Sequence, residues 1–236
     1  MSGKNKKAGT TGRKKNPGKA MVLYTTALVL LLVALFFINQ ANKDGTQDLT
    51  RVDVQPSIAD QPVIGSEDAK VTLIEFGDYK CPSCKKWSQD VYPVLKAEYI
   101  DTGKMKLAFV NTLFHGDESE LGALAGEAVF SQNKDAFWVF NEAMFNAQPS
   151  ANHDGLWITE EKIAELATTI TPQIDIEKLK NDLSNRTTLP QVQVDNALVE
   201  KYRINQTPTL MINGITIANP FDIESIKSVI DKELGV

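Results

Sequence analysis

The two cysteines of this chain, Cys81 and Cys84, stand two residues apart in the segment EFGDYKCPSCKKW (residues 75–87). A CXXC pair can bind a metal, form a structural bridge, or exchange electrons with other thiols. Zinc needs further ligands, and the two histidines, His115 and His153, fit no usual zinc spacing. A bridge across so short a loop stabilises little. The pattern therefore favours redox exchange, with metal binding and a structural bridge as the alternatives.

The segments around the cysteines form a β-α-β pattern. Residues 71–76 (VTLIEF) and 106–114 (KLAFVNTLF) are apolar runs typical of buried strands, and a helical pattern interrupted by Pro93 lies between them. The pair would then stand at the start of that helix, where free N–H groups and the positive end of the helix dipole favour a thiolate. This position predicts that Cys81 is the exposed attacking thiolate and Cys84 the resolving thiol.

The remaining segments complete the pattern of elements. A block of helical segments follows the second strand, and one of them begins at Thr159 with carboxylates suited to a helix start. Two short strands joined by Asn213-Gly214, a usual hairpin turn, and a last amphipathic helix close the chain. This order predicts an α/β, thioredoxin-like fold over residues 61–236, with a helical subdomain inserted at about 117–203.

A threonine–proline pair, Thr207-Pro208, stands directly before the predicted strand TLMIN. A proline there can simply mark the edge of a sheet. In a thioredoxin-like fold it would instead be a cis-proline that packs beside the cysteines and presents the preceding backbone to an extended peptide. Pro82 and Ser83, between the cysteines, are expected to support the pair, because proline suits the first turn of a helix.

Glu75 is the one acid in the predicted strand VTLIEF and lies six residues before Cys81. A carboxyl group inside a buried strand has a raised pKa and could move protons to or from Cys84. The alternative is a side chain that faces water from an edge strand.

Residues 20–38 (AMVLYTTALVLLLVALFFI) carry no charge and have about the length that spans a bilayer. Residues 1–19 hold seven Lys and Arg side chains and no acid, which predicts a basic cytoplasmic tail and a single-pass cell-membrane anchor with the rest of the chain outside. A cleaved signal peptide is the alternative, although its apolar core is usually shorter and no small-x-small site follows. Residues 39–60 are polar and without periodicity, as expected of a linker.

The charge balance and the cysteine count restrict the classes of protein further. The whole chain has a net charge of −5 despite its basic tail, so the predicted domain is acidic, which argues against nucleic acid as a partner. An exported domain works where disulfides persist, yet two cysteines do not make a disulfide-stapled scaffold. No obvious dimerisation element is present, so a monomer is expected.

With these residues in place, the sequence resembles the DsbA family of thiol:disulfide oxidoreductases, and in particular its membrane-anchored Gram-positive branch, BdbD. The resemblance is carried by E-F-G-D-Y-K-C-P-S-C-K (residues 75–85), F-V-N with F-H-G (residues 109–116) and T-P-T (residues 207–209). The anchor, the helical insert and the final hairpin and helix also match, so the resemblance covers nearly the whole chain.

The resemblance implies a role for each matching residue. Cys81 would be the nucleophile, Cys84 the resolving thiol, Pro208 the cis-proline and Glu75 the buried acid. Such proteins need no cofactor beyond their redox-active disulfide, which they donate to secreted proteins with reduced cysteines. A quinone-linked membrane protein of the DsbB type (BdbC in this branch) reoxidises them. Ser83 stands where many Gram-negative members have histidine, which implies a somewhat weaker oxidant.

The resemblance also implies a structural divalent cation, Ca²⁺, remote from the thiols. Hard oxygen ligands would be required. Glu127, a lone carboxylate inside LGALAGEAVF, is the first candidate ligand, with Gln61 and Asp195 beside it. The alternative is that Glu127 faces solvent or pairs with a lysine. His115 is expected either to approach the thiols or to be a hydrogen-bonded structural residue.

Three functions remain open from the sequence. The first is an extracytoplasmic thiol oxidase that donates its disulfide. The second keeps the fold and reverses the electron flow, as in a thiol reductase or isomerase. The third is a non-catalytic, membrane-anchored chaperone that binds peptides at the T-P-T segment.

Overall fold

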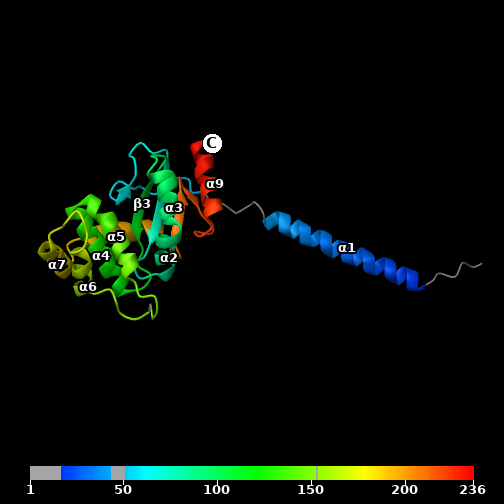
Figure 1. Ribbon diagram of the computed structural model, residues 1–236, viewed down its shortest axis with the longest axis horizontal. Helices are drawn as coiled ribbons and strands as arrows, with labels where there is room; N and C mark the ends of the chain where they lie inside the picture. Colours follow the sequence, from blue (N-terminus) through cyan, green and yellow to red (C-terminus); the bar gives the residue numbers. More distant parts are fainter. Residues whose placement is uncertain (1–16, 44–50, 153) are drawn as a thin grey trace, which may run out of the picture. The chain divides into compact units, whose positions relative to one another are not determined.

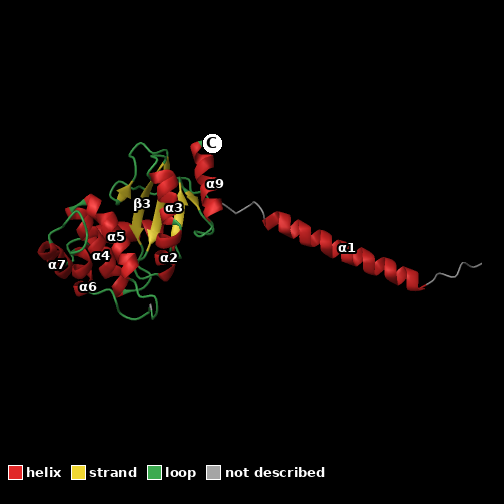
Figure 2. Ribbon diagram, in the orientation of Figure 1, coloured by secondary structure: helices red, strands yellow, loops and turns green. Residues whose placement is uncertain are grey.

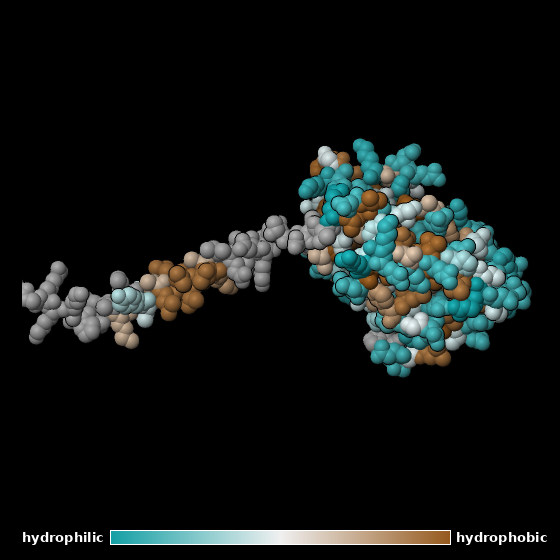
Figure 3. All heavy atoms as spheres, turned by 180° about the vertical axis from the view of Figure 1, so that it is seen from behind, coloured by the Kyte–Doolittle hydropathy of each residue, from teal (hydrophilic) through white to brown (hydrophobic). Residues whose placement is uncertain are grey.

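The computed structural model describes residues 17–43, 51–152 and 154–236, in two compact units that divide at Gln47 and Asp48. The first unit contains α1 (Pro17–Lys43), whose described middle part is covered by apolar side chains (Figure 3). Among the described residues, no helix is long and apolar enough to cross a membrane. The anchor at residues 20–38 therefore stays a prediction. The predicted tail at residues 1–19 lies, up to residue 16, outside the described residues.

The second unit is built on a five-stranded mixed sheet with the strand order β1-β3-β2-β4-β5 (Figures 1 and 2). The central strand β2 (Val71–Gly77) is buried along its whole length and pairs in parallel with β3 (Met105–Asn111). On its other side it pairs antiparallel with β4 (Thr209–Ile212). The short strands β1 (Val63–Ile64) and β5 (Ile215–Thr216) form the edges. This topology confirms the predicted thioredoxin-like fold.

Alternate residues of the strands enter two different cores, because successive side chains of a strand point to opposite faces. On one face, Leu73 and Leu107 pack against α2 (Pro82–Asp90), α3 (Tyr92–Leu95), the π-helix η1 (Lys96–Ile100) and α9 (Ile223–Leu234). On the other face, Ile74 and Ala108 pack against α8 (Leu189–Lys201). Both faces of β2 are therefore covered, which explains its continuous apolar sequence.

Pro93 ends the first helical segment, as its interruption of the pattern suggested. It occupies the first turn of α3, where its missing N–H costs no hydrogen bond, and Val91 separates the two helices. The hairpin between β4 and β5 is also as predicted. Asn213 and Gly214 both have positive φ, 45° and 83°, which suits the tight turn that joins these strands.

The helical insert between β3 and β4 has a core of its own, and it contains α4 to α8. Its helices besides α8 are α4 (Asp117–Gln132), α5 (Lys134–Ala147), α6 (Glu160–Ala167) and α7 (Ile176–Asn185). Thr159 begins α6 as predicted, because its side chain accepts a hydrogen bond from the backbone N–H of Lys162. The aromatic side chains of α5 pack in this core beside Phe109 of β3 and the two cysteines.

The folded unit begins before the predicted start at residue 61. Arg51 forms an isolated bridge with Ile215 of β5, and the N–H of Val52 donates to the Gly214 carbonyl at 2.9 Å. The hydroxyl of Tyr202 donates to the Val54 carbonyl at 3.0 Å. The later part of the predicted linker at residues 39–60 thus packs on the edge of the sheet. Residues 44–50 of that linker lie outside the described residues.

Candidate active site

The CXXC pair lies at the start of α2, as the sequence predicted. Cys81 is the N-cap of the helix and Pro82 is its first residue. The N–H groups of Cys84 and Lys85 donate to the Cys81 carbonyl at 3.1 and 3.2 Å, which closes the first turn. Both cysteines are thiols in this structure rather than a disulfide.

The two cysteines differ in burial, although less than the sequence suggested. Cys84 has no solvent exposure, and Cys81 keeps 6%. The prediction that Cys81 is exposed was therefore wrong, because the side chain is largely buried. The helical insert packs over α2, so that both cysteines belong to the core formed by α4 and α5. Cys81 is nevertheless the more accessible of the two, as an attacking thiol must be.

The environment shifts the pKa values of the two thiols in opposite directions. A hydrogen bond from the Cys84 thiol lowers the pKa of Cys81 to about 5, assisted by the N–H groups of Ser83 and Cys84 at the helix start, although burial acts the other way. Burial raises the pKa of Cys84, and its hydrogen bond to Cys81 raises it further. Cys81 is therefore a thiolate at neutral pH, while Cys84 keeps its proton.

The Thr207–Pro208 peptide bond is cis, as predicted. It immediately precedes β4, the antiparallel neighbour of β2. The Thr207 carbonyl lies 3.4 Å from Cys81 Sγ, which donates to it when protonated. The cysteine pair and the T-P-T segment, 126 residues apart in sequence, thus meet at one point of the surface.

Glu75 is a buried acid, as predicted, and does not face water from an edge strand. It lies in the central strand, opposite Phe109 of β3 and Leu210 of β4, and is 3% exposed. Its Oε1 accepts no hydrogen bond from any described residue. Burial raises the pKa of this carboxyl group well above its usual value, and the charge of Cys81 raises it further. The protonated form of Glu75 therefore persists to a higher pH than that of an ordinary carboxyl group, which suits a proton donor.

Asp78, which directly follows β2, contacts both cysteines through its backbone and was missed as a site residue by the sequence reasoning. Its N–H donates to Cys84 Sγ at 3.4 Å, and its carbonyl accepts from the N–H of Cys81 at 3.0 Å. The only sequence signal for it is its place inside the segment EFGDYKC, between the strand and the pair.

Two further residues fix the backbone around Cys81, and neither was predicted. Gln148, at the end of α5, is buried, and its Nε2 donates to the carbonyls of Tyr79 and Cys81 at 2.9 and 3.2 Å. Lys80 is 5% exposed and its Nζ donates to Glu118 Oε1 at 2.5 Å. The insert is thus bonded directly to the loop that carries the nucleophile.

The three predicted cation ligands meet at a second polar cluster, around Asn111 at the end of β3. Asp195 accepts from Gln61 Nε2 at 2.7 Å and from Asn111 Nδ2 at 2.7 Å, and Glu127 accepts from Asn111 Nδ2 at 3.0 Å. We call Gln61, Asn111, Glu127 and Asp195 the oxygen cluster. All four are at most 5% exposed, so Glu127 does not face solvent. Sequence reasoning missed Asn111, because a polar residue at a strand end is common.

Burial also raises the pKa values of the two acids in the oxygen cluster. The pKa of Glu127 rises to about 8, and the Asp195 charge adds to the effect of burial. The pKa of Asp195 rises to about 6, although hydrogen bonds from Asn111 and Gln61 oppose the rise. Gln61 Oε1 and Asn111 Oδ1 are buried and accept no hydrogen bond from described residues. Among these residues no group of three or more His, Cys, Asp and Glu side chains is arranged to hold a metal ion.

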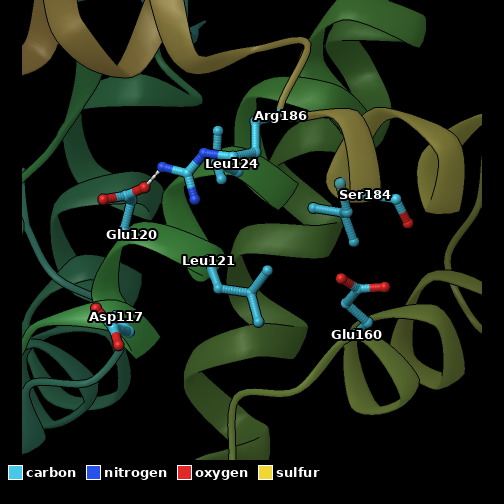
Figure 4. Close-up of a pocket in the computed structure, with 8 residues that line it drawn as sticks. Asp117, Glu120, Leu121, Leu124, Glu160, Ser184 and Arg186 are labelled. Carbon is cyan, nitrogen blue, oxygen red and sulfur yellow. Dashed lines mark ion pairs between the residues drawn. The ribbon is translucent and has the colours of Figure 1, made fainter.

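A hollow on the helical insert is separate from both clusters. It is lined by residues of α4, α6 and the end of α7, and the ion pair between Glu120 and Arg186 crosses one side of it (Figure 4). Its lining residues include neither of the cysteines nor Glu75. Nothing in its lining suggests redox chemistry.

The fold and the CXXC pair define a thioredoxin-like protein with a thiol site. A protein-family model described as thioredoxin matches residues 57–232, which is most of the chain. Among curated proteins, disulfide bond formation protein D of Bacillus subtilis (strain 168) is 43% identical over 193 residues, covering 82% of this chain and 86% of that protein. The probable disulfide bond formation protein D of Bacillus anthracis is 36% identical over 214 residues, covering 91% and 94%.

Solved structures agree with these relatives. The crystal structure of oxidised BdbD from Bacillus subtilis has a TM-score of 0.75 and 44% identity, covering 79% of this chain and 99% of that one. DsbA from Chlamydia trachomatis, at 21% identity, has a TM-score of 0.67 over 78% of this chain and 96% of that one, which shows the shared fold. The chain belongs to the thioredoxin family, as a thiol:disulfide oxidoreductase of the DsbA type.

Proposed function

We propose that this oxidoreductase donates the Cys81–Cys84 disulfide to secreted or cell-surface proteins on the outer face of the cell membrane. The observation that carries this direction of electron flow is the opposite shift of the two thiol pKa values, to about 5 for Cys81 and upward for Cys84. A stabilised thiolate lowers the free energy of the reduced form, so the disulfide is readily given away.

The reaction follows from the geometry of the pair. A substrate thiolate attacks Cys81 Sγ of the oxidised protein, the S–S bond breaks, and the electron pair leaves on Cys84 Sγ. The Asp78 N–H stabilises this sulfur, and protonated Glu75, which interacts electrostatically with both cysteines, supplies a proton to it. A second substrate thiolate then attacks the substrate sulfur of the mixed disulfide, and Cys81 leaves as a thiolate. The substrate gains a disulfide and the protein gains two electrons.

The Thr207 carbonyl beside Cys81 supports binding of substrate as an extended chain, because it offers an acceptor to a backbone N–H at the point of attack. Reoxidation must remove two electrons from the pair. A DsbB/BdbC-like membrane protein that passes them to a quinone is the proposed partner. The uncharged run at residues 20–38 and the basic residues before it support the proposed anchor and the placement of the folded unit outside the cell.

A structural Ca²⁺ ion at the oxygen cluster is a further part of the proposal. Two buried carboxyl groups and two buried amide oxygens without hydrogen bonds fit the hard oxygen ligands that calcium prefers. Glu127, Asp195, Gln61 and Asn111 would hold the ion. It would neutralise the two acids and tie the segment before β1 to α4 and α8, and it would take no part in the thiol chemistry.

The reduction potential of the full-length chain in detergent, equilibrated in glutathione buffers, tests the proposed function. We expect a value well above about −180 mV together with oxidation of a reduced test substrate such as ribonuclease. A value near about −270 mV, the range of thioredoxin, would make a reductase the better description. Absence of a cooperative two-electron titration would reject thiol exchange altogether and leave peptide binding.

The proposed location has its own test. A membrane-impermeant maleimide added to intact cells is expected to label Cys81 after mild reduction. Labelling that requires cell lysis would contradict the extracytoplasmic placement.

A further inference from the structure

The side chain of Asp78 is held by four donors. Its Oδ1 accepts from the N–H of Lys80 at 2.8 Å. Its Oδ2 accepts from the N–H of Phe114 at 3.1 Å and from the Ser119 hydroxyl at 2.9 Å, and it lies 2.6 Å from His115 Nδ1. The carboxylate is completely buried. A carboxylate offers about four lone-pair positions, so this one is saturated.

These donors come from three separate parts of the fold. Lys80 belongs to the loop before the cysteines, Phe114 and His115 follow β3, and Ser119 lies in the first turn of α4. Ser119 Oγ also accepts from the backbone N–H of His115 at 3.0 Å, so His115, Ser119 and Asp78 are each hydrogen-bonded to the other two and form a closed set. The carboxylate therefore fixes where the backbone of Asp78 lies relative to β3 and α4.

The backbone of Asp78 is the part that contacts the sulfur. Its N–H donates to Cys84 Sγ, and the Cys84 thiol in turn donates to the Cys81 thiolate. Hydrogen bonds in such a chain polarise one another, so a donor to Cys84 Sγ makes the Cys84 thiol a better donor to Cys81. A shift of Asp78 that lengthens the first bond would weaken the second.

His115 is the one exposed member of the set, with 38% of its side chain accessible. A carboxylate has no proton to donate, so Nδ1 carries the hydrogen of this bond. We propose that His115 is a positioning residue of the redox site, which acts through the Asp78 carboxylate to hold the Asp78 N–H on Cys84 Sγ and so stabilises the reduced form of the pair.

The direction of the effect follows from the charges at the site. The imidazole N–H offsets the negative charge of the Asp78 carboxylate, which otherwise disfavours the Cys81 thiolate three residues further along the chain. Lys80, the one buried Lys or Arg among the described residues, is already paired with Glu118. Loss of the imidazole N–H therefore destabilises the thiolate through both geometry and charge. The reduction potential falls and the pKa of Cys81 rises.

The test compares two replacements of similar size in the full-length chain, His115→Asn and His115→Leu. Asparagine can place an N–H near the position of Nδ1, whereas leucine cannot. We expect His115→Leu to lower the equilibrium constant against glutathione about fivefold, or about 20 mV, with a matching rise in the Cys81 pKa followed by thiolate absorbance. His115→Asn should stay within about twofold of the wild type.

This inference rests on the proposed role of Cys81 as the attacking thiolate, and the two can fail separately. If the wild type shows no redox titration or no low Cys81 pKa, the proposed function is at fault. If the wild type titrates normally and His115→Leu matches it, or if both replacements shift the potential equally, the role of His115 is rejected. Should His115→Leu not fold, Ser119→Ala removes another donor to Asp78 and is expected to shift the potential in the same direction. A wild-type potential in Ser119→Ala would then reject the inference.

Discussion

The redox site and the oxygen cluster begin at neighbouring positions of the sheet, since Gly77 at the end of β2 pairs with Asn111 at the end of β3. Both sites bury two carboxyl groups, but the hydrogen-bond donors are distributed differently between the two acids of each site. At the redox site, Asp78 takes four donors while Oε1 of Glu75 accepts none from the described residues. In the oxygen cluster, Asn111 Nδ2 donates to both Glu127 and Asp195, and Gln61 Nε2 donates to Asp195.

This difference agrees with the two roles that we propose, proton transfer at the redox site and cation binding at the oxygen cluster. The saturated carboxyl group of Asp78 fixes the geometry of the loop before the cysteines. Burial raises the pKa of Glu75, whose Oε1 accepts no hydrogen bond from described residues, and we propose this residue as the proton donor. In the oxygen cluster, two partly hydrogen-bonded carboxyl groups lie beside two amide oxygens that accept no hydrogen bond from described residues. Such a set of oxygens suits the divalent ion that we propose. The identity of a buried acid therefore says less about its role than the donors around it.

The largest expected effect comes from removing the nucleophile. Cys81→Ala should reduce oxidation of a thiol substrate by more than about 100-fold, because the remaining cysteine, Cys84, has no solvent exposure and is out of reach of a substrate thiol. The free energy of unfolding should change by about 1 kcal/mol or less, since a small side chain is lost and the oxygen cluster is untouched. Substrate oxidation and thermal unfolding measure the two quantities. Retained oxidase activity would contradict the assigned nucleophile.

Calcium should affect the second site alone. At about 100 times its dissociation constant, calcium is expected to raise the free energy of unfolding by about 2.7 kcal/mol without changing the reduction potential. Asp195→Asn should abolish this stabilisation, because it removes a charged ligand. Glu200→Gln, an exposed change on the same helix, should keep it. Equal calcium responses in the two variants would place the ion elsewhere.

The calcium-free protein should lose stability as pH rises. The pKa values of Glu127 and Asp195 are raised on folding to about 8 and about 6, so the folded protein binds protons that the unfolded chain releases. This contribution is complete below about pH 4 and is lost as the pH passes about 8. Chemical unfolding at a series of pH values measures it. Calcium should remove the loss, since the ion binds the ionised carboxylates.

Glu75→Gln should slow disulfide transfer about tenfold while the oxygen cluster is unchanged. The wild-type rate of the step that protonates Cys84 falls as Glu75 loses its proton, and the variant should lack that dependence on pH. Stopped-flow kinetics across a range of pH separates the two profiles. An unaltered pH profile in the variant would assign the proton to another group.

The smallest effect is expected at the exposed pair between Lys86 and Asp90 on α2. Lys86→Ala should change the free energy of unfolding by about 0.5 kcal/mol or less and leave the Cys81 pKa in place, because water screens charges at the surface. A large shift of that pKa would mean that the charge on α2, rather than the hydrogen bonds described above, controls the thiolate.

Local patterns in the sequence were sufficient for much of the fold. The apolar run 71–76 predicted a buried strand, Pro93 predicted an interruption of the helix that follows, and Asn213-Gly214 predicted the hairpin turn, and the structure confirms all three. The placement of the cysteine pair at a helix start followed from its position between two strands. These features depend on residues that are close together in sequence, so they could be predicted from the sequence alone.

Contacts between distant segments decided the rest. Nothing near Cys81 in sequence shows that the insert covers it, that Gln148 binds its carbonyl, or that Glu118 pairs with Lys80. The gathering of Gln61, Glu127 and Asp195 was expected from a resemblance, but the amide of Asn111 that joins the two acids was not.

The residues of this sequence, taken alone, determined that a thiol pair stands at the start of a helix beside a buried acid. Only the tertiary structure decided which acids lack donors and which are saturated, because the pKa of a buried carboxyl group depends on hydrogen bonds from segments many residues away. Glu75 and Asp78 are three positions apart in the chain, and it is the loop after β3 and the first turn of α4 that surround one of them with donors.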